Sequence, residues 1–314
     1  MTAVTSVSGS YADLFNVYVT NASQYTDEGD EAVAITGSVT ATQADAIADA
    51  TSGIVTATIT ADTASALNSA LVDSGSQVNA YDLTISAGSA EATDLTSLDG
   101  KTSKVVNAAA VTEITGSATE VAAAYAANPT TGITGLGNET VSITGTTVAT
   151  LAELKAINNA TSGTITLNTQ SINADYSGSV ADVKAAFAGI TTPTGKITLT
   201  DSSVSVADIN TVATVTIGEV TATVTSGAAS VLKSLTTTST DAITMTVNAE
   251  ASGATAAADL VSLNGNTNKA ITMTAVTSVS GSYADLLDVY VTNANEYTDE
   301  GDEDVAITGN VTAP

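Results

Sequence analysis

Residues 33–53 read VAITGSVTATQADAIADATSG, a stretch rich in threonine and β-branched residues followed by an alanine-rich stretch that carries acids. Val33 and Ile35 stand two positions apart, which is the period of a β-strand. The second half has the composition and spacing of a short helix. A strand face and a helix stripe in one unit must bury each other and the neighbouring unit, so this stretch predicts one layer of an α/β repeat.

The same pairing of stretches recurs along the chain, for example at 140–163, 196–214 and 219–238. About ten such units, each of roughly 27 residues, fill the repeat period described below. Most predicted helices begin with a capping box, in which a Ser or Thr caps one backbone N–H and an acid three residues later reaches back to another. The boxes are Ser10/Asp13, Thr42/Asp45, Ser117/Glu120, Thr150/Glu153, Ser179/Asp182, Ser205/Asp208 and Ser282/Asp285.

A longer repeat encloses these units. Residues 1–41 recur at 273–313 with six differences, at positions 15, 16, 23, 24, 32 and 38. Self-similarity at a fixed period is typical of stacked repeat architectures. We therefore expect residues 1–272 to be one period of a longer tandem array and residues 273–314 to begin the next. Residues 105–145 also align with 270–309, sharing Tyr125/Tyr290, Gly137/Gly301 and Glu139/Glu303, so the period itself was built by duplication.

These patterns predict an α/β repeat solenoid with a continuous parallel β-sheet and one strand plus a short helix or turn per coil. Parallel strands stack about 4.8 Å apart, whereas helices need roughly 10 Å, so long helices fit only some coils. The run Tyr11–Tyr25 is the clearest candidate for a longer helix. Immunoglobulin-like modules of about 91 residues are the alternative, and the recurring capping boxes argue against them.

The composition restricts the chemistry of the protein. Acids number 33 against seven basic residues, all of them lysines, and histidine, cysteine and tryptophan are absent. The usual general base, phosphate clamp, thiol nucleophile and soft metal ligands are therefore missing, which predicts a protein that is not an enzyme. A hydrolase that works with carboxylates alone is the remaining catalytic alternative. Nucleic-acid binding is disfavoured because the sequence has no stripe of basic residues. A membrane span is not expected, because no apolar stretch approaches the roughly 20 residues that it needs.

The net charge of −26 also bears on location. High negative charge keeps a long polymer soluble, and strong salt screens its self-repulsion to within a few ångströms. Few lysines and no arginines leave few sites for trypsin-type proteases. Together these features predict an extracellular or cell-surface protein.

Several units carry a family resemblance. Residues 33–59 (VAITGSVTATQADAIADATSGIVTATI), 133–143 (ITGLGNETVSI) and 97–112 (SLDGKTSKVVNAAAVT) resemble the tandem repeats of giant cell-surface proteins of marine picocyanobacteria, including one needed for non-flagellar swimming. The resemblance spans the chain, but its motifs are of low complexity. It implies export, great length and a structural or motility-related role, and it implies no catalytic residues.

The acidic turn TDEGDE, at 26–31 and again at 298–303, is the candidate metal site. It places carboxylates around a glycine, and hard oxygen ligands on a tight turn suit calcium. The candidate ligands are Asp27, Glu28, Asp30, Glu31, Asp299, Glu300, Asp302 and Glu303. The spacing matches neither an EF-hand loop nor the calcium-binding β-roll repeat, so a solvated acidic turn is the alternative.

Tyrosines are a second candidate, since Tyr11, Tyr18 and Tyr25 lie seven residues apart. On a helix this spacing forms one stripe, which serves either as core or as a binding surface for sugars. Two functions follow from the sequence. The first is a structural segment forming a filament, stalk or layer, whose partners are neighbouring repeats and other copies of itself. The second is an adhesin-type module that binds surface polysaccharide, with calcium as a stabilising ion.

Overall fold

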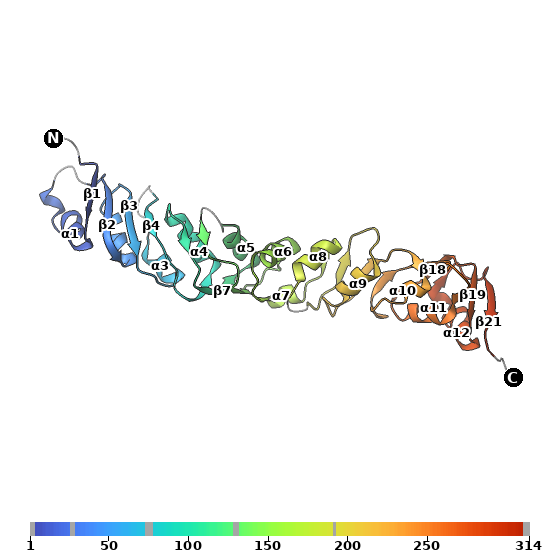
Figure 1. Ribbon diagram of the computed structural model, residues 1–314. Coiled ribbons are helices and arrows are strands. Elements are labelled where there is room, and N and C mark those ends of the chain that lie inside the picture. Colours follow the sequence, from blue (N-terminus) through green and yellow to red (C-terminus); the bar gives the residue numbers. More distant parts are fainter. Residues whose placement is uncertain (1–3, 26–28, 73–77, 128–131, 191–192, 310–314) are drawn as a thin grey trace. The chain divides into compact units, whose positions relative to one another are not determined.

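The computed structural model describes residues 4–25, 29–72, 78–127, 132–190 and 193–309. In this part of the chain short strands alternate with short helices (Figure 1). Contacts divide the chain into unit 1, which is Met1–Ala149 with Ala156–Asn168, and unit 2, which is Thr150–Lys155 with Thr169–Pro314. The predicted division at residue 272 concerns sequence repetition and stays a prediction.

Unit 1 contains parallel sheets with short helices between their strands. Its strands are β1 (Ser6–Gly9), β2 (Ala32–Val39), β3 (Val55–Ile59), β4 (Ala80–Asp82), β5 (Gly88–Glu91), β6 (Val106–Asn107), β7 (Val111–Gly116), β8 (Ile133–Thr134), β9 (Thr140–Ile143) and β10 (Ile165–Thr166). Its helices are α1 (Tyr11–Phe15), α2 (Ala41–Ala48), α3 (Ala64–Ala70), α4 (Ala92–Lys101) and α5 (Ala118–Ala126). The sheets have the orders β1-β2-β3-β4, β10-β9-β7-β5 and β6-β8, and Figure 1 shows β1 to β4 side by side.

Unit 2 repeats this organisation, and α6 (Leu151–Ala160) contributes residues to both units. Its other helices are α7 (Thr169–Ile172), α8 (Val180–Phe187), α9 (Val206–Ala213), α10 (Ala229–Leu232), α11 (Ala257–Asn264) and α12 (Tyr283–Leu287). Its strands are β11 (Tyr176–Gly178), β12 (Ile197–Leu199), β13 (Val220–Thr223), β14 (Gly227–Ala228), β15 (Ala242–Thr244), β16 (Thr246–Asn248), β17 (Thr255–Ala256), β18 (Ile271–Ala275), β19 (Ser278–Gly281), β20 (Tyr297–Thr298) and β21 (Asp304–Ile307). The sheet orders are β11-β12-β13-β15, β14-β16-β18-β20 and β17-β19-β21.

The α/β class with parallel sheets is confirmed. All pairings between the described strands are parallel, so the immunoglobulin-like alternative is wrong. The single continuous sheet is not what the structure shows, because the strands belong to several separate sheets. The reason is local: only Met245 separates β15 from β16, yet β15 pairs with β13 whereas β16 pairs with β14 and β18. One stretch of chain thus serves two sheets.

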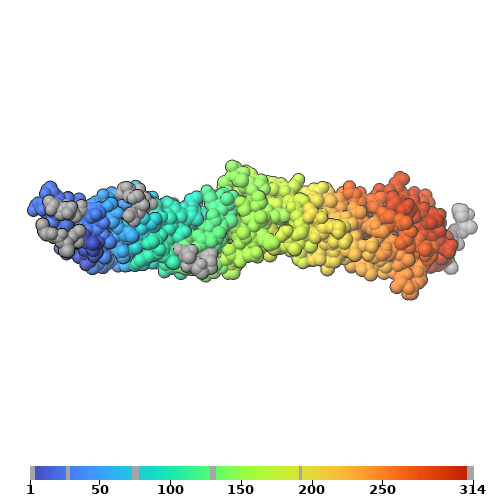
Figure 2. Space-filling model, turned by 90° about the horizontal axis from the view of Figure 1, so that it is seen from above, coloured from blue at the N-terminus to red at the C-terminus, as the bar shows by residue number. Residues whose placement is uncertain are grey.

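Residues close in sequence also lie close in space within each unit. In Figure 2 the colours of unit 1 change in order along its surface, so each band of surface comes from one stretch of chain. We call a strand and the helix that follows it a layer, and both parts of a layer contribute residues to the core, such as Val33 with Ile47 and Ile114 with Val121. The described helices are all too short or too polar to cross a membrane.

Side-chain caps start most of the helices, as predicted. Ser10, Ser117, Thr150, Ser179, Ser205 and Ser282 accept the N–H of the acid three residues later. The seventh box is wrong: α2 is capped by Thr40 with Gln43, two residues before Thr42/Asp45.

The return bond of these caps depends on side-chain length. Gln43, Glu120 and Glu153 reach the backbone N–H of the capping residue. Each aspartate is one methylene shorter than a glutamate, and its carboxylate accepts the Ser hydroxyl instead, as at Ser10 and Asp13 (2.7 Å). The full capping box therefore forms only where the third residue is Glu or Gln.

The run Tyr11–Tyr25 is helical but is not one helix. α1 is followed by a π-helical turn η1 (Asn16–Thr20) and a 3₁₀ turn η2 (Ala22–Gln24). The changes in residues per turn rotate the tyrosines away from one stripe. Tyr18 is buried, which confirms the core interpretation for that residue, whereas Tyr25 is 48% exposed. η3 (Asp288–Thr292) and η4 (Ala294–Glu296) repeat this geometry after α12.

Candidate functional site

Three turns of sequence Gly-x-Glu precede strands β2, β9 and β21, and we call them Gly-x-Glu turns: Gly29–Glu31, Gly137–Glu139 and Gly301–Glu303. In each, the glutamate folds back and accepts the N–H of its own glycine at 2.8 Å. A tyrosine hydroxyl from the preceding helical segment donates to the same carboxylate; the tyrosines are Tyr18, Tyr125 and Tyr290. The glycines have φ of 111°, 141° and 108°, a region that other residues rarely adopt.

The glutamates of these turns are buried, with exposed fractions of 4% for Glu31, 2% for Glu139 and 9% for Glu303. Hydrogen bonds to a charged group favour that charge, whereas burial opposes it. At Glu31 the Gly29 N–H prevails over burial and holds the pKa of the carboxyl below its ordinary value. Burial, followed by the neighbouring glutamate, raises the pKa of Tyr125 and Tyr290. These glutamates therefore stabilise the backbone of the turn.

The predicted calcium ligands are only partly placed. Asp27 and Glu28 lie outside the described residues. Asp30 and Asp302 are exposed, whereas Glu31 and Glu303 point into the turn.

Asp299 and Glu300 complete the second set of candidate ligands. Asp299 has a positive φ of 61° and accepts the Thr274 hydroxyl at 2.6 Å. Glu300 and Glu303 each have one buried carboxylate oxygen for which the described residues offer no hydrogen-bond donor. In the part of the chain that the structure describes, no three His, Cys, Asp or Glu side chains converge as metal ligands. The calcium site therefore stays a prediction.

Buried threonines form a second recurring site, which we call the threonine clip. The clips lie in the tripeptides 51–53, 102–104, 161–163, 216–218 and 267–269, each of sequence Thr-x-Gly or Thr-x-Lys. Each threonine hydroxyl donates to a backbone carbonyl of the preceding layer: Thr51 to Glu31, Thr102 to Tyr81, Thr161 to Glu139, Thr216 to Gly195 and Thr267 to Ile243. The same oxygen accepts the N–H two residues later, at 2.9–3.1 Å. One buried hydroxyl thus satisfies two backbone groups and joins two layers.

Two clips rest directly on Gly-x-Glu turns. The N–H of Ser52 donates to the Gly29 carbonyl at 2.6 Å, and Ser162 does the same to Gly137 at 2.9 Å. A Cβ atom at Gly53 would overlap the carbonyl of Glu31, so this glycine permits the close approach of the two segments. Turn and clip therefore form one composite contact between consecutive layers.

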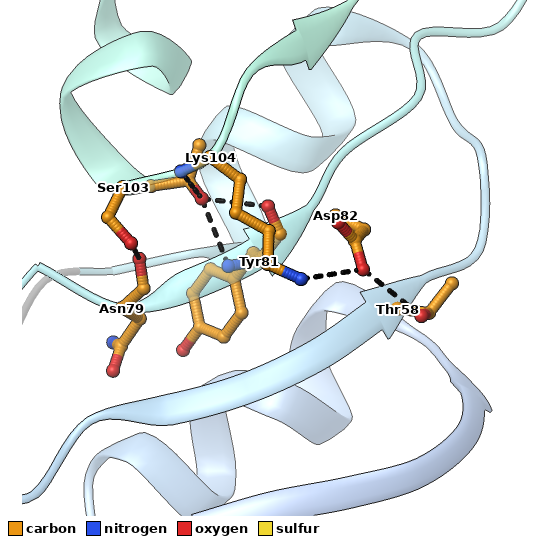
Figure 3. Close-up of polar contacts among 7 residues, drawn as sticks. Thr58, Asn79, Tyr81, Asp82, Ser103 and Lys104 are labelled. Carbon is orange, nitrogen blue, oxygen red and sulfur yellow. Dashed lines mark hydrogen bonds and ion pairs between the residues drawn. The ribbon is translucent and has the colours of Figure 1, made fainter.

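Figure 3 shows the clip at 102–104, where an ion pair joins the hydrogen bonds. Ser103 donates from its hydroxyl to the Asn79 carbonyl, and Lys104 pairs with Asp82 at 2.9 Å. Asp82 also accepts the Thr58 hydroxyl from the neighbouring strand at 3.4 Å. Three successive layers of unit 1 are linked by this one cluster.

Lysine side chains also link neighbouring layers. The ion pairs are Lys104–Asp82, Lys155–Asp182, Lys184–Asp208, Lys196–Glu219 and Lys233–Asp259, and each links one layer to the next. Hydrogen bonds from the paired lysines hold the pKa of Asp182, Asp208 and Glu219 below their ordinary values. Lys101 instead donates to the Asn68 and Leu71 carbonyls at the end of α3. Ion pairs that are this open to solvent contribute little to stability, so they align layers more than they stabilise them.

Sequence reasoning missed the clips, although a signal was present. Thr-Ser-Gly occurs at 51–53 and again at 161–163, and Thr-x-Lys occurs at 102–104 and 267–269, each time just after a helix. In a threonine-rich chain this spacing is hard to separate from the background. The alignment of Tyr125 with Tyr290 and of Glu139 with Glu303 marked these residues as shared, but it did not predict the hydrogen bond between tyrosine and glutamate.

No family model, curated protein or solved structure matches the chain. Comparison within the chain is therefore the informative one. The middle residue of the Gly-x-Glu turn is Asp30, Asn138 or Asp302. Since the turn around Asn138 keeps the same hydrogen bonds, the acid at this position is not needed to form the turn.

Proposed function

We propose that this chain is a non-catalytic structural segment of a large extracellular or cell-surface protein. Its layers stack as a repeat solenoid of parallel strands, with one strand and a short helix or turn per coil of roughly 27 residues. Helices that begin at Tyr11, Ala41, Ala64, Ala92 and Ala118 in unit 1, and at Val180, Val206, Ala229, Ala257 and Tyr283 in unit 2, support this spacing. The parallel pairing of consecutive strands supports it as well.

The proposal rests mainly on what the polar side chains bond to. Carboxylates, hydroxyls and amines are the groups with which this composition could bind or react. In the clips and ion pairs described above, these groups bond one layer to the next. Such links hold the register of a stack, which is the requirement of a filament, stalk or layer.

The acid excess and the resemblance to giant surface repeats supply the setting. A charge of −26 on 314 residues keeps a long polymer solvated, and strong salt screens the repulsion between its charges. We therefore place the segment outside the cell, with neighbouring repeats of the same chain as its main partners. Cell-surface polysaccharide is the partner in the adhesin alternative.

Electron microscopy of the source cells tests the surface role. An antibody raised against the purified chain should label continuous fibres or a continuous layer outside the cell envelope. Antibody first absorbed with the purified chain is the control. Label confined to a distinct tip on isolated thin rods favours the adhesin, and label inside the cell contradicts the proposal.

Small-angle scattering of the purified chain tests the stacking. A compact chain of 314 residues has a radius of gyration of about 20 Å. A stack of about ten coils should exceed this value clearly, and a second 272-residue period fused to the first should increase it in proportion to length. A radius near 20 Å contradicts the solenoid.

A further inference from the structure

An apolar depression of about 320 Å³ lies on α12, η3 and β21. We call it the C-terminal face, and the residues that line it are Tyr283, Leu286, Leu287, Tyr290, Val291, Val305 and Ile307. Val305 and Ile307 are each 50% exposed, although both are β-branched residues of a strand. An exposed apolar surface on the edge of a sheet is a typical docking site.

The first copy of the repeat shows the same residues covered. Val33 and Ile35 correspond to Val305 and Ile307 at an offset of 272, and their exposed fractions are only 1% and 7%. The six sequence differences between the copies spare these positions. The two environments therefore differ through what lies against them.

The covering element in the first copy is the next unit of the repeat, residues 41–59. β3 pairs with β2 in parallel, Val55 lies opposite Val33, and the Val33 N–H donates to the Ile54 carbonyl at 2.9 Å. α2 packs against both α1 and β2. By contrast, β21 pairs with β19, and its other edge has no partner among the described strands.

We propose that the C-terminal face binds one further unit of this repeat, with the sequence of residues 41–59. This proposal rests on the stacking proposed above and names the surface through which stacking continues. The added strand lies parallel to β21, with its valine opposite Val305 as Val55 lies opposite Val33. The added helix covers Tyr290 and Leu287 as α2 covers the first copy.

We expect the occupant to contribute a strand, because the C-terminal face includes, as well as apolar side chains, the backbone edge of β21 that pairs with no described strand. A free parallel edge presents N–H and C=O groups that another strand satisfies in register. In a second folded copy, the strand Val55–Ile59 is already paired with β2, so it is not available to dock in trans. The occupant is therefore an additional unit of the repeat, whose strand is not already paired.

The test adds this unit to the full chain. Residues 42–72 are appended after Ala313 in place of Pro314, because Ala313 corresponds to Ala41. Hydrogen exchange of the amides of Val305, Ala306 and Ile307 should slow by about tenfold or more relative to the parent chain, since local opening now requires the added unit to leave. In the control graft, the added copies of Val55 and Ile59 are replaced by Asn, and exchange should remain as fast as in the parent.

Ile307→Asn supplies a second reading. In the parent chain it should change exchange in α12 by less than about twofold, and in the grafted chain it should remove the added protection. Equal protection in graft and control graft, or protection that survives Ile307→Asn, overturns the proposal. A graft that fails to fold leaves β21 exchanging as in the parent and also overturns it. None of these results alters antibody labelling at the cell surface, so the two proposals fail separately.

Discussion

Residues 4–41 and 276–309 belong to two copies of one sequence in two different environments. Val33 is 1% exposed and its counterpart Val305 is 50% exposed. At the opposite side of the repeat the order reverses, because Tyr25 is 48% exposed and its counterpart Tyr297 is 3% exposed. The local sequence is nearly identical, so the burial of these side chains is decided by the neighbouring layer.

Local conformation, by contrast, is the same in both copies. Ser10 and Ser282 cap their helices, and each five-residue helix passes into a π-helical turn and a 3₁₀ turn. Glu31 and Glu303 both accept the glycine N–H of their turn. Short-range hydrogen bonds therefore fix the shape of a layer, and contacts with the next layer fix its burial.

The largest expected effect comes from paired substitutions on the strand that the copies share. Val33→Asn should lower the free energy of unfolding by about 3–5 kcal/mol, because it removes buried apolar surface and leaves an amide without partners. Val305→Asn should cost less than about 1 kcal/mol, since half of this side chain already meets water. Denaturant unfolding of both variants makes the measurement. Equal losses would show that local sequence, not the neighbouring layer, sets the energetics.

The threonine clip is expected to give the next largest effect. Thr51→Val keeps the shape of the side chain but removes the hydroxyl that bonds the Glu31 carbonyl and the Gly53 N–H. Leaving buried backbone groups unpaired should cost about 1–3 kcal/mol. Thr60→Val is the matched control, because Thr60 is exposed, and it should stay within about 0.5 kcal/mol. A neutral Thr51→Val would mean that water satisfies both backbone groups.

The sequence could predict the layers but not all of the contacts between them. Helix caps such as Ser117 follow from a local pattern. The internal alignment showed that Tyr125 and Glu139 both recur, but their hydrogen bond was visible only in the structure. The prediction of Thr42 as a cap was wrong because Thr40 also has a suitable residue three positions later, Gln43. The sequence pattern alone does not show which of these two threonines caps the helix. The several sheets and the clips depend on which strand lies next to which. A single sequence carries little information on which strands become neighbours.

The Gly-x-Glu turn is the feature that both copies share, and its ionisation gives a pH test. The pKa of Glu31 is lowered on folding, so its contribution is present above its ordinary value of 4.5 and is lost as the pH falls through the folded pKa. Glu31→Gln should therefore destabilise by about 1–2 kcal/mol at pH 7 and much less at a pH below the folded pKa. Glu91→Gln, at an exposed position, is the control. A loss that is the same at both pH values would contradict the ionised turn.

Substitution of the tyrosine that is buried in only one copy, Tyr297, should lower the free energy of unfolding by a smaller amount. Tyr297 donates its hydroxyl to the Leu260 carbonyl at 3.1 Å, whereas Tyr25 is exposed. Tyr297→Phe should cost about 1 kcal/mol and Tyr25→Phe close to nothing. Burial also raises the pKa of Tyr297, so its contribution is present below about pH 10 and is lost as the pH rises through the folded pKa. Equal costs for the two variants would show that the covering layer does not distinguish these positions.

The smallest expected difference between the two copies is the stabilisation that each acidic turn gains from calcium. A site with a dissociation constant of about 10⁻³ M would add about 0.4 kcal/mol at 1 mM calcium, by mass action on the folded state. The effect should be larger at Asp302 than at Asp30, because Glu300 and Glu303 beside Asp302 carry buried oxygens that lack a donor. Thermal melts of the parent, Asp30→Asn and Asp302→Asn chains, with chelator and then with calcium at matched ionic strength, measure this difference. A calcium-dependent rise that Asp302→Asn abolishes and Asp30→Asn keeps would assign the ion to the second copy, whereas identical midpoints throughout would leave both turns as solvated acidic turns.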